Sequence, residues 1–304
     1  MSSTEEGRFH TVDFSTIDAR VPPDTSASPP GPRRVTLRAR DGVPIEALHE
    51  PCTAGPAATA IVVAHGFTGS VDRPALRRAA GVLARRAGVV TFSFRGHGRS
   101  GGRSTVGDRE VLDLAAAVEW ARSLGYARVV TAGFSMGGSV VLRHAAMYGA
   151  HSAERVEKDA AHSAEKAAKH GGRMEARSDA VAAVSAPARW YYRGTAPMRR
   201  LHWVVSRPVG RLVGRYGFRT RIHPEDWDPV PLSPVEAVPL IAPTPLLIVH
   251  GDRDPYFPLD HPRMLAAAAM GGSAELWLEV GMGHAENAAD EALLVRLADW
   301  LVGA

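Results

Sequence analysis

The sequence predicts an α/β fold: a doubly wound, mostly parallel sheet covered by helices on both faces. Three features predict it. Short, almost wholly apolar segments recur along the chain, amphipathic segments with helical spacing separate them, and glycine-containing turns follow several of the apolar segments. Apolar strands that alternate with helices are typical of a parallel sheet buried on both sides. The length of 304 residues allows a sizeable core.

The N-terminal part of the chain lacks this alternation. Residues 1–33 end in a stretch rich in Pro, Ser and Gly, "VPPDTSASPPGP", which predicts a flexible arm. The next residues, "VTLRARDGVPIEALHEP", place two strand-like segments around the dipeptide "DG" and predict an N-terminal hairpin. We therefore expect one α/β domain over residues 34–304.

The alternation of strands and helices follows the hairpin. Strands are predicted at 59–66, 88–94, 127–134, 179–187, 244–254 and 273–280. Helices are predicted at 73–87, 106–124, from Ser135 onward, 260–271 and 286–302. Two segments, 150–178 and 188–243, interrupt this order.

The first interruption, 150–178, is rich in Ala, Glu and Lys and predicts a solvated, charged helical extension. It contains "AHSAE" twice, eleven residues apart, so His151 and His162 would share one face of a helix. Glu154 and Glu165 lie close to these histidines in sequence, so the four residues are candidate metal ligands. Positions eleven residues apart are separated by about 16 Å along a helix, too far to share one ion.

The second interruption, 188–243, carries seven arginines between residues 199 and 221, interleaved with apolar and aromatic residues. Pro208 and the glycines that follow it predict short or broken helices. Two interpretations stay open. The segment is either a basic surface with an apolar face packed on the domain, or a cap over a pocket. In the second case the arginines would face an anionic group or an acidic lipid surface.

Composition and charge exclude several classes of protein. The net charge of +4 is small, and no nucleic-acid-binding module is present, so we expect no nucleic-acid partner. Cys52 is the only cysteine, which excludes an intrachain disulfide and fits a reducing compartment. No apolar run is long enough for a membrane span, and no signal-peptide pattern opens the chain. We expect a cytoplasmic protein without integral membrane contact; peripheral lipid contact and the oligomeric state stay open.

The segment "VVTAGFSMGGSVVLRHAAM" carries the first candidate for chemistry, Ser135. Gly133 and Gly137 flank it as G-x-S-x-G between a predicted strand and a predicted helix. A sharp strand-to-helix turn needs small residues at these positions and points the serine hydroxyl outward at the helix N-terminus. The pattern in this context indicates a nucleophile.

A serine nucleophile needs a base, and the base needs an orienting carboxylate. His284, in "VGMGHAENAAD", follows the last predicted strand on a glycine-containing loop. The segment "HGDRDPYFP" supplies two candidate carboxylates, Asp252 and Asp254, and the sequence order Ser, Asp, His is that of one known arrangement of this triad. Backbone N–H groups of Phe67, in "HGFTGS", and of Met136 are candidate donors to a developing oxyanion.

With these motifs the chain resembles the α/β-hydrolase fold superfamily, especially the serine esterase, lipase and acylaminopeptidase-like hydrolases of bacteria. The likeness rests on "HGFTGS", "FRGHGRSGG", "GFSMGG" and "HGDRDPYFP" followed by "GMGHAE", in the family's order. The resemblance implies that Ser135 is the nucleophile, Asp254 the acid and His284 the base. It also implies an oxyanion hole formed by Phe67 and Met136.

The resemblance implies a carboxylesterase-like serine hydrolase that cleaves a small acyl ester through an acyl-enzyme, without a cofactor or a metal. A thioesterase, an acyltransferase or a peptidase of the same fold remains an alternative. A non-catalytic binding protein of the same fold is a further alternative, although such proteins usually lack a member of the triad. The sequence does not predict the acyl chain length or the leaving group.

Overall fold

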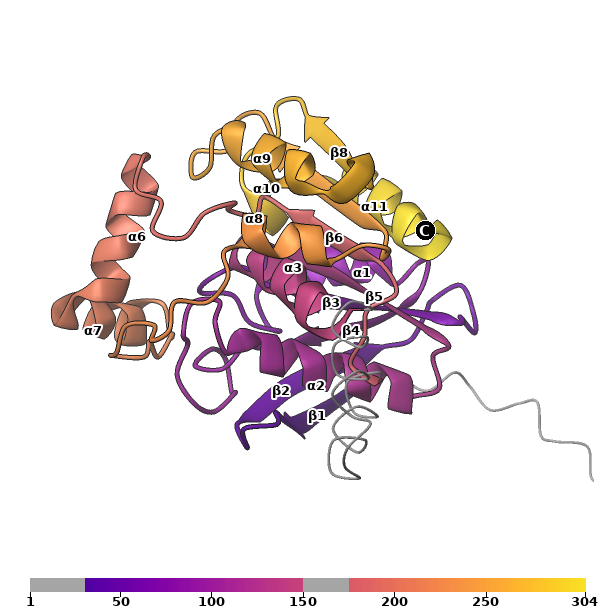
Figure 1. The fold of residues 1–304 in the computed structure, drawn as a ribbon. Helices are drawn as coiled ribbons and strands as arrows, with labels where there is room; N and C mark the ends of the chain where they lie inside the picture. The colour runs from indigo at the N-terminus through magenta and orange to yellow at the C-terminus, as the bar shows by residue number, and fades with distance from the viewer. Residues whose placement is uncertain (1–30, 150–174) are drawn as a thin grey trace, which may run out of the picture. The chain divides into compact units, whose positions relative to one another are not determined.

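The computed structural model describes residues 31–149 and 175–304. In this part of the chain eight strands form one sheet in the order β1-β2-β4-β3-β5-β6-β7-β8 (Figure 1). The strands are β1 Arg33–Arg38, β2 Pro44–Glu50, β3 Thr59–Ala64, β4 Gly88–Phe92, β5 Arg128–Phe134, β6 Val181–Val184, β7 Leu246–Gly251 and β8 Ala274–Glu279. β2 pairs antiparallel with β1 and with β4, and the remaining neighbours are parallel. The predicted hairpin and the mostly parallel sheet are therefore confirmed.

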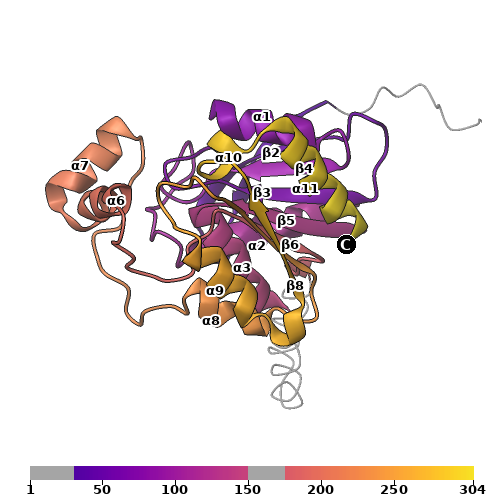
Figure 2. The same cartoon turned by 90° about the horizontal axis from the view of Figure 1, so that it is seen from above.

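The helices cover both faces of this sheet. They are α1 Pro74–Leu83, α2 Glu110–Ser123, α3 Met136–Tyr148, α6 Ala196–Ser206, α7 Pro208–Gly217, α8 Pro234–Ala237, α9 Asp260–Ala268, α10 Ala285–Ala288 and α11 Glu291–Gly303, with 3-10 turns at Val238–Leu240 and Met270–Gly272. α1, α10 and α11 lie on one face of the sheet, and α2, α3, α8 and α9 lie on the other (Figure 2). Each set buries apolar side chains in its own core cluster. The central strands β3 to β7 are buried along most of their length, as a sheet covered on both faces requires.

Several predicted boundaries were wrong for local reasons. The helix predicted from residue 106 begins at Glu110, whose buried carboxylate accepts hydrogen bonds from the backbone N–H groups of Thr105 and Gly107 and holds the preceding residues in a loop. The helix predicted over 286–302 is two helices, because the Asp290 side chain caps α11 by accepting from the N–H of Leu293. The helix predicted over 73–87 ends at Leu83.

The structure describes all of the second interrupting segment but only the end of the first. Most of the predicted extension 150–178, including both "AHSAE" repeats with His151, Glu154, His162 and Glu165, lies outside the described residues. In 188–243, α6 and α7 are short and meet at Arg207, just before Pro208, as the proline and glycines predict. Both helices lie to one side of the sheet in both views (Figures 1 and 2). Within the described residues, no helix is long and apolar enough to cross a membrane.

Candidate active site

Ser135 occupies the sharp turn between β5 and α3. Its backbone has φ 53° and ψ −114°, in the left-handed range that non-glycine residues rarely adopt. Its N–H donates to the carbonyl of Val184 in the adjacent strand β6 at 2.9 Å, and its carbonyl accepts the N–H of Ser139 at 3.2 Å. These bonds fix the turn from both sides and leave the hydroxyl free to project from the carboxyl edge of the sheet.

The two flanking glycines are required by backbone contacts. A Cβ on Gly133 would lie 2.2 Å from the carbonyl oxygen of Gly137. A Cβ on Gly137 would lie 2.2 Å from the carbonyl oxygen of Ala64, at the end of β3. A Cβ on Gly138 would lie 2.8 Å from the Cβ of Ala186, just past β6. The start of α3 therefore packs against the sheet backbone at a distance that only glycine allows.

His284 lies between Ser135 and a buried carboxylate. It follows β8, and its Nε2 is 2.9 Å from Ser135 Oγ while its Nδ1 is 2.7 Å from Asp254 Oδ2. An ionised carboxylate only accepts hydrogen bonds, so Nδ1 carries the proton and Nε2 faces the serine with its lone pair. The arrangement can therefore receive the serine proton at Nε2.

Asp254 is held ionised in a buried position. Burial of its side chain would raise the pKa of the carboxyl group, but hydrogen bonds from His284 and from the N–H groups of Tyr256 and Phe257 outweigh it and lower that pKa. The other candidate, Asp252, is exposed and accepts a hydrogen bond from the N–H of Gly281. The structure thus brings Asp254, and not Asp252, to His284.

The candidate oxyanion donors lie on the two segments beside the serine. Phe67 follows β3 and Met136 is the first residue of α3, and both line the same pocket as Ser135. The N–H of Met136 belongs to the first turn of the helix, where backbone donors lack partners within the helix. Both residues therefore stay candidates for donors to an oxygen bound at Ser135.

Sequence reasoning missed two residues that position the Phe67 loop. His65 Nε2 accepts from the N–H of Phe94, while its Nδ1 donates to the carbonyl of Gly66 at 2.6 Å. Burial lowers the pKa of His65 to about 3, which keeps the ring neutral and able to make both bonds. Glu286 accepts from the N–H of Gly66 at 3.3 Å. The sequence could have indicated both residues, because each lies close to a candidate site residue: His65 is two residues before Phe67, and Glu286 is two residues after His284.

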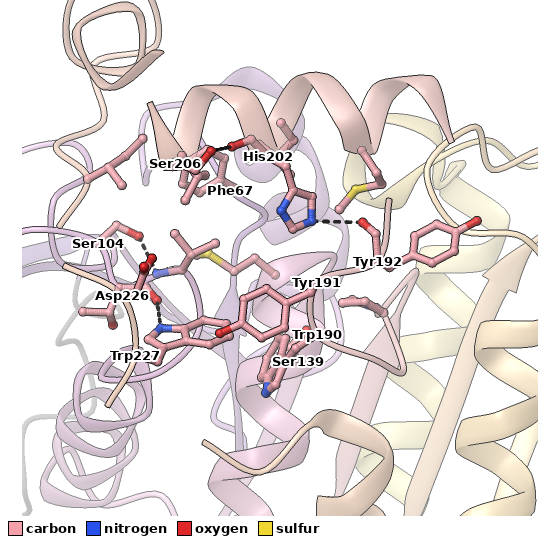
Figure 3. A pocket seen from close by; sticks show the side chains of 18 of the residues that line it. Phe67, Ser104, Ser139, Trp190, Tyr191, Tyr192, His202, Ser206, Asp226 and Trp227 are labelled. Atoms are coloured by element: carbon pink, nitrogen blue, oxygen red, sulfur yellow. Dashed lines mark hydrogen bonds between the residues drawn. The ribbon is translucent and has the colours of Figure 1, made fainter. Parts of the chain in front are cut away.

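Ser135 is one of the residues that line a pocket with a volume of about 190 Å³. Figure 3 shows this pocket from close by. Most of its lining is apolar, with the aromatic side chains of Phe67, Trp190, Tyr191, Tyr192, Trp227 and Phe257. Trp227 is fixed by donation of its indole N–H to the carbonyl of Thr105 at 2.7 Å. Helix α6 lies over the pocket and contributes His202 and Ser206 (Figure 3).

The arginines of the second interruption mostly point elsewhere. Of the seven between residues 199 and 221, all of which the structure describes, Arg211 alone lines the pocket, and its guanidinium donates to the carbonyl of Ser206. Arg189 and Arg193, which precede this run, also line the pocket. The segment therefore combines elements of both interpretations: part of it covers the pocket, and most of its arginines lie on the outer surface.

The chain matches one protein family in sequence and is similar to several solved structures in fold. A family model described as the alpha/beta hydrolase family matches residues 61–296. The Pyrococcus furiosus esterase Pf2001 is similar in structure, with a TM-score of 0.62 and 20% sequence identity over 89% of this chain and 91% of that one. XC6422 from Xanthomonas campestris, an α/β serine hydrolase without a lid, gives a TM-score of 0.52 and 19% identity over 90% and 93%. Est1E from Butyrivibrio proteoclasticus, solved with ferulic acid bound, gives 0.52 and 18% over 88% and 97%.

No curated protein sequence matches the chain. The structural similarities, all at 20% identity or below, establish the fold alone. The family model is the stronger finding because it spans more than half of the 304 residues, including the turn at Ser135 and the loops of Asp254 and His284. This chain is a member of the alpha/beta hydrolase family.

Proposed function

We propose that the protein is a serine hydrolase that cleaves carboxylic esters through an acyl-enzyme. The observation that carries the proposal is the continuous hydrogen-bonded chain from Ser135 through His284 to the buried Asp254, at the floor of an apolar pocket. A hydroxyl is a weak nucleophile at neutral pH, and this arrangement removes its proton during attack. The esterases among the similar structures agree with this assignment.

The proposed reaction has two steps. Ser135 Oγ attacks the ester carbonyl while His284 Nε2 takes its proton, and the N–H groups of Phe67 and Met136 bind the oxyanion. His284 then gives this proton to the leaving alkoxide, which departs as an alcohol and leaves an acyl-serine. Water repeats the sequence: His284 removes its proton, the oxygen adds to the acyl carbon, and the proton returns to Ser135 as the acid leaves. Asp254 stabilises the imidazolium in both steps.

The pocket supports an ester with an apolar group on the acyl or the alcohol side. Its aromatic side chains offer stacking surfaces, and its small volume suits a ring or a short chain rather than a polymer. We also propose that 188–243 acts as the cap of this pocket, because Trp190, Met198 and Trp227 from this segment line it. The cap supplies most of the aromatic surface.

Labelling with a fluorophosphonate tests the nucleophile. The wild-type protein should label and hydrolyse p-nitrophenyl esters, and Ser135→Ala should do neither. Ser139→Ala is the matched control, because Ser139 lines the same pocket and its buried hydroxyl has no partner among the described residues. Ser139→Ala should keep both properties. A wild-type protein that neither labels nor turns over would refute the proposed function, and labelling that persists in Ser135→Ala would refute the choice of nucleophile.

A further inference from the structure

The outer surface of α6 and α7 is strongly basic. Residues 180–224 contain nine arginines and no aspartate or glutamate. Arg199, Arg200 and Arg215 on these helices are exposed, and no carboxylate of the described residues lies within ion-pair distance of them. Elsewhere in the described chain, arginines commonly pair with carboxylates, as Arg77 does with Glu50. The positive charge on α6 and α7 is therefore uncompensated.

The same surface exposes large apolar side chains. Trp203 on α6 is 47% exposed, and Val209, Leu212 and Tyr216 on α7 are 62%, 55% and 74% exposed. Val213 and Phe218, beside them in the chain, are also exposed, so six of the thirteen exposed large apolar side chains of the described chain lie between residues 203 and 218. A groove between the two helices, lined by Ala196, Trp203, Val204, Val213 and Phe218, is bordered by Arg199 and Arg200.

The two faces of α6 have different neighbours. Met198, Leu201, His202 and Val205 line the same pocket as Ser135. His202 is labelled in Figure 3. Arg199, Arg200 and Trp203 belong to the outer groove. One helix thus separates the candidate active site from the basic, apolar surface. Arg199 also donates to the carbonyl groups of Arg193 and Gly194 in the loop before α6, but these bonds leave its charge, like that of Arg200, without an acidic partner among the described residues.

We propose that the outer surface of α6 and α7 binds an anionic lipid bilayer. Short helices with arginines beside exposed aromatic and aliphatic side chains lie in the plane of a membrane interface, with their apolar groups among the acyl chains. The arginines then meet lipid phosphates, and their aliphatic stems also lie in the apolar layer. The groove bordered by Arg199 and Arg200 suits one acyl chain beneath an anionic headgroup.

Two other occupants fit this surface less well. A second copy of the chain would form a two-fold interface that sets the same patch against itself, so arginines would face arginines without an acidic partner. A nucleic acid would use the arginines and aromatic rings, but Val209, Leu212 and Val213 offer no surface for base stacking. A bilayer uses both the charge and the aliphatic side chains.

Vesicle sedimentation tests the proposal with the full-length protein. We expect binding to vesicles of phosphatidylglycerol and phosphatidylcholine in a 3:7 ratio, weaker binding in high salt, and little binding to pure phosphatidylcholine. Each arginine near an anionic surface contributes about fivefold in affinity, so Arg199→Gln, Arg200→Gln and Arg215→Gln together should lower it about 100-fold. The double variant Leu212→Ser with Tyr216→Ser should weaken vesicle binding at least tenfold. It should also reduce the binding that remains in high salt.

The control variant removes the same charge elsewhere. Arg33→Gln, Arg38→Gln and Arg263→Gln replace exposed arginines on β1 and α9 and should leave vesicle binding within about threefold. Circular dichroism monitors the folding of every variant, and hydrolysis of a soluble short-chain ester is a second check for the variants that keep Ser135. Because Ser135→Ala should bind vesicles like the wild type, the lipid proposal and the proposed function can fail separately.

Three outcomes would overturn the lipid proposal. The first is no binding to the anionic vesicles, or equal binding to neutral ones. The second is an equal loss of binding in the control and in the α6–α7 arginine variant. The third is tight binding of single-stranded DNA that the α6–α7 arginine variant abolishes, without vesicle binding, which would assign the surface to nucleic acid.

Discussion

The imidazole Nε2 of His284 lies 2.9 Å from the hydroxyl oxygen of Ser135, although the two residues are 149 positions apart in the chain. The sheet produces this proximity. β5, β6, β7 and β8 are parallel, so their carboxyl ends meet at one edge. Ser135 follows β5, Asp254 follows β7 and His284 follows β8. Loops at the carboxyl ends of parallel strands are where an open α/β sheet forms its sites.

Replacement of the buried carboxylate tests its assignment. Asp254→Asn keeps the size of the side chain but removes the charge and changes which histidine tautomer it favours. We expect kcat to fall about 10⁴-fold, with little change in the thermal unfolding temperature. Steady-state hydrolysis of a p-nitrophenyl ester measures this.

Asp252→Asn is the matched control, because Asp252 is exposed and contacts the backbone of Gly281 rather than His284. This variant should keep its kcat within a few-fold of the wild type. Equal losses in the two variants, or none in Asp254→Asn, would reject Asp254 as the residue that orients His284.

Gly137, two residues after Ser135, should tolerate no side chain. Gly137→Ala would place a Cβ 2.2 Å from the backbone oxygen of Ala64, so strand β3 or helix α3 must move. We expect destabilisation of about 3 kcal/mol and a loss of activity, measured by urea unfolding and ester hydrolysis. Gly81→Ala is the control: Gly81 lies in α1 with nothing near its Cβ position, and the change should stabilise by about 1 kcal/mol. A stable, active Gly137→Ala would contradict the close packing.

Arg95 in "FRGHGRSGG" joins two carboxylates that lie far apart in the sequence. Its guanidinium, 3% exposed, donates to the fully buried Asp113 at 2.7 Å and to Asp41 at 2.6 Å. Burial would lower the pKa of Arg95, but the bonds to the two carboxylates outweigh it and raise that pKa. Arg95→Met leaves Asp113 buried without its partner and should destabilise the protein by about 3–5 kcal/mol. Denaturant unfolding measures the change.

The double variant Arg95→Met with Asp113→Leu separates the charge from the packing. Removing both charges removes the uncompensated carboxylate, so the double variant should be more stable than Arg95→Met alone. A double variant that is less stable than Arg95→Met would contradict this explanation. The destabilisation by Arg95→Met would then not come from an unpaired Asp113 carboxylate.

The sequence predicted the sheet and the turn at Ser135 because each depends on local patterns. Apolar runs specify buried strands, and G-x-S-x-G after such a run specifies the turn through contacts within a few residues. The choice between Asp252 and Asp254 was not local: both follow β7, and only the three-dimensional course of the loop decides which one meets His284. The pocket lining was harder still, since Trp190 and Trp227 come from an irregular segment whose path depends on contacts such as that of Trp227 with Thr105.

The buried His144 should make the protein sensitive to acid. Its ring in α3 is fully buried and stacks on Tyr148, neither ring nitrogen has a hydrogen-bond partner among the described residues, and burial lowers its pKa to about 3. The unfolded chain, in which a histidine has its ordinary pKa of 6.5, therefore binds a proton that the folded protein does not. Stability falls as the pH drops below about 6.5, by up to about 1.4 kcal/mol per pH unit for this one group. His144→Leu should reduce that slope between pH 6 and 4 and leave the slope above pH 7 unchanged, as urea unfolding at each pH would show. An unchanged slope in the acid range would mean that His144 gains its proton while folded.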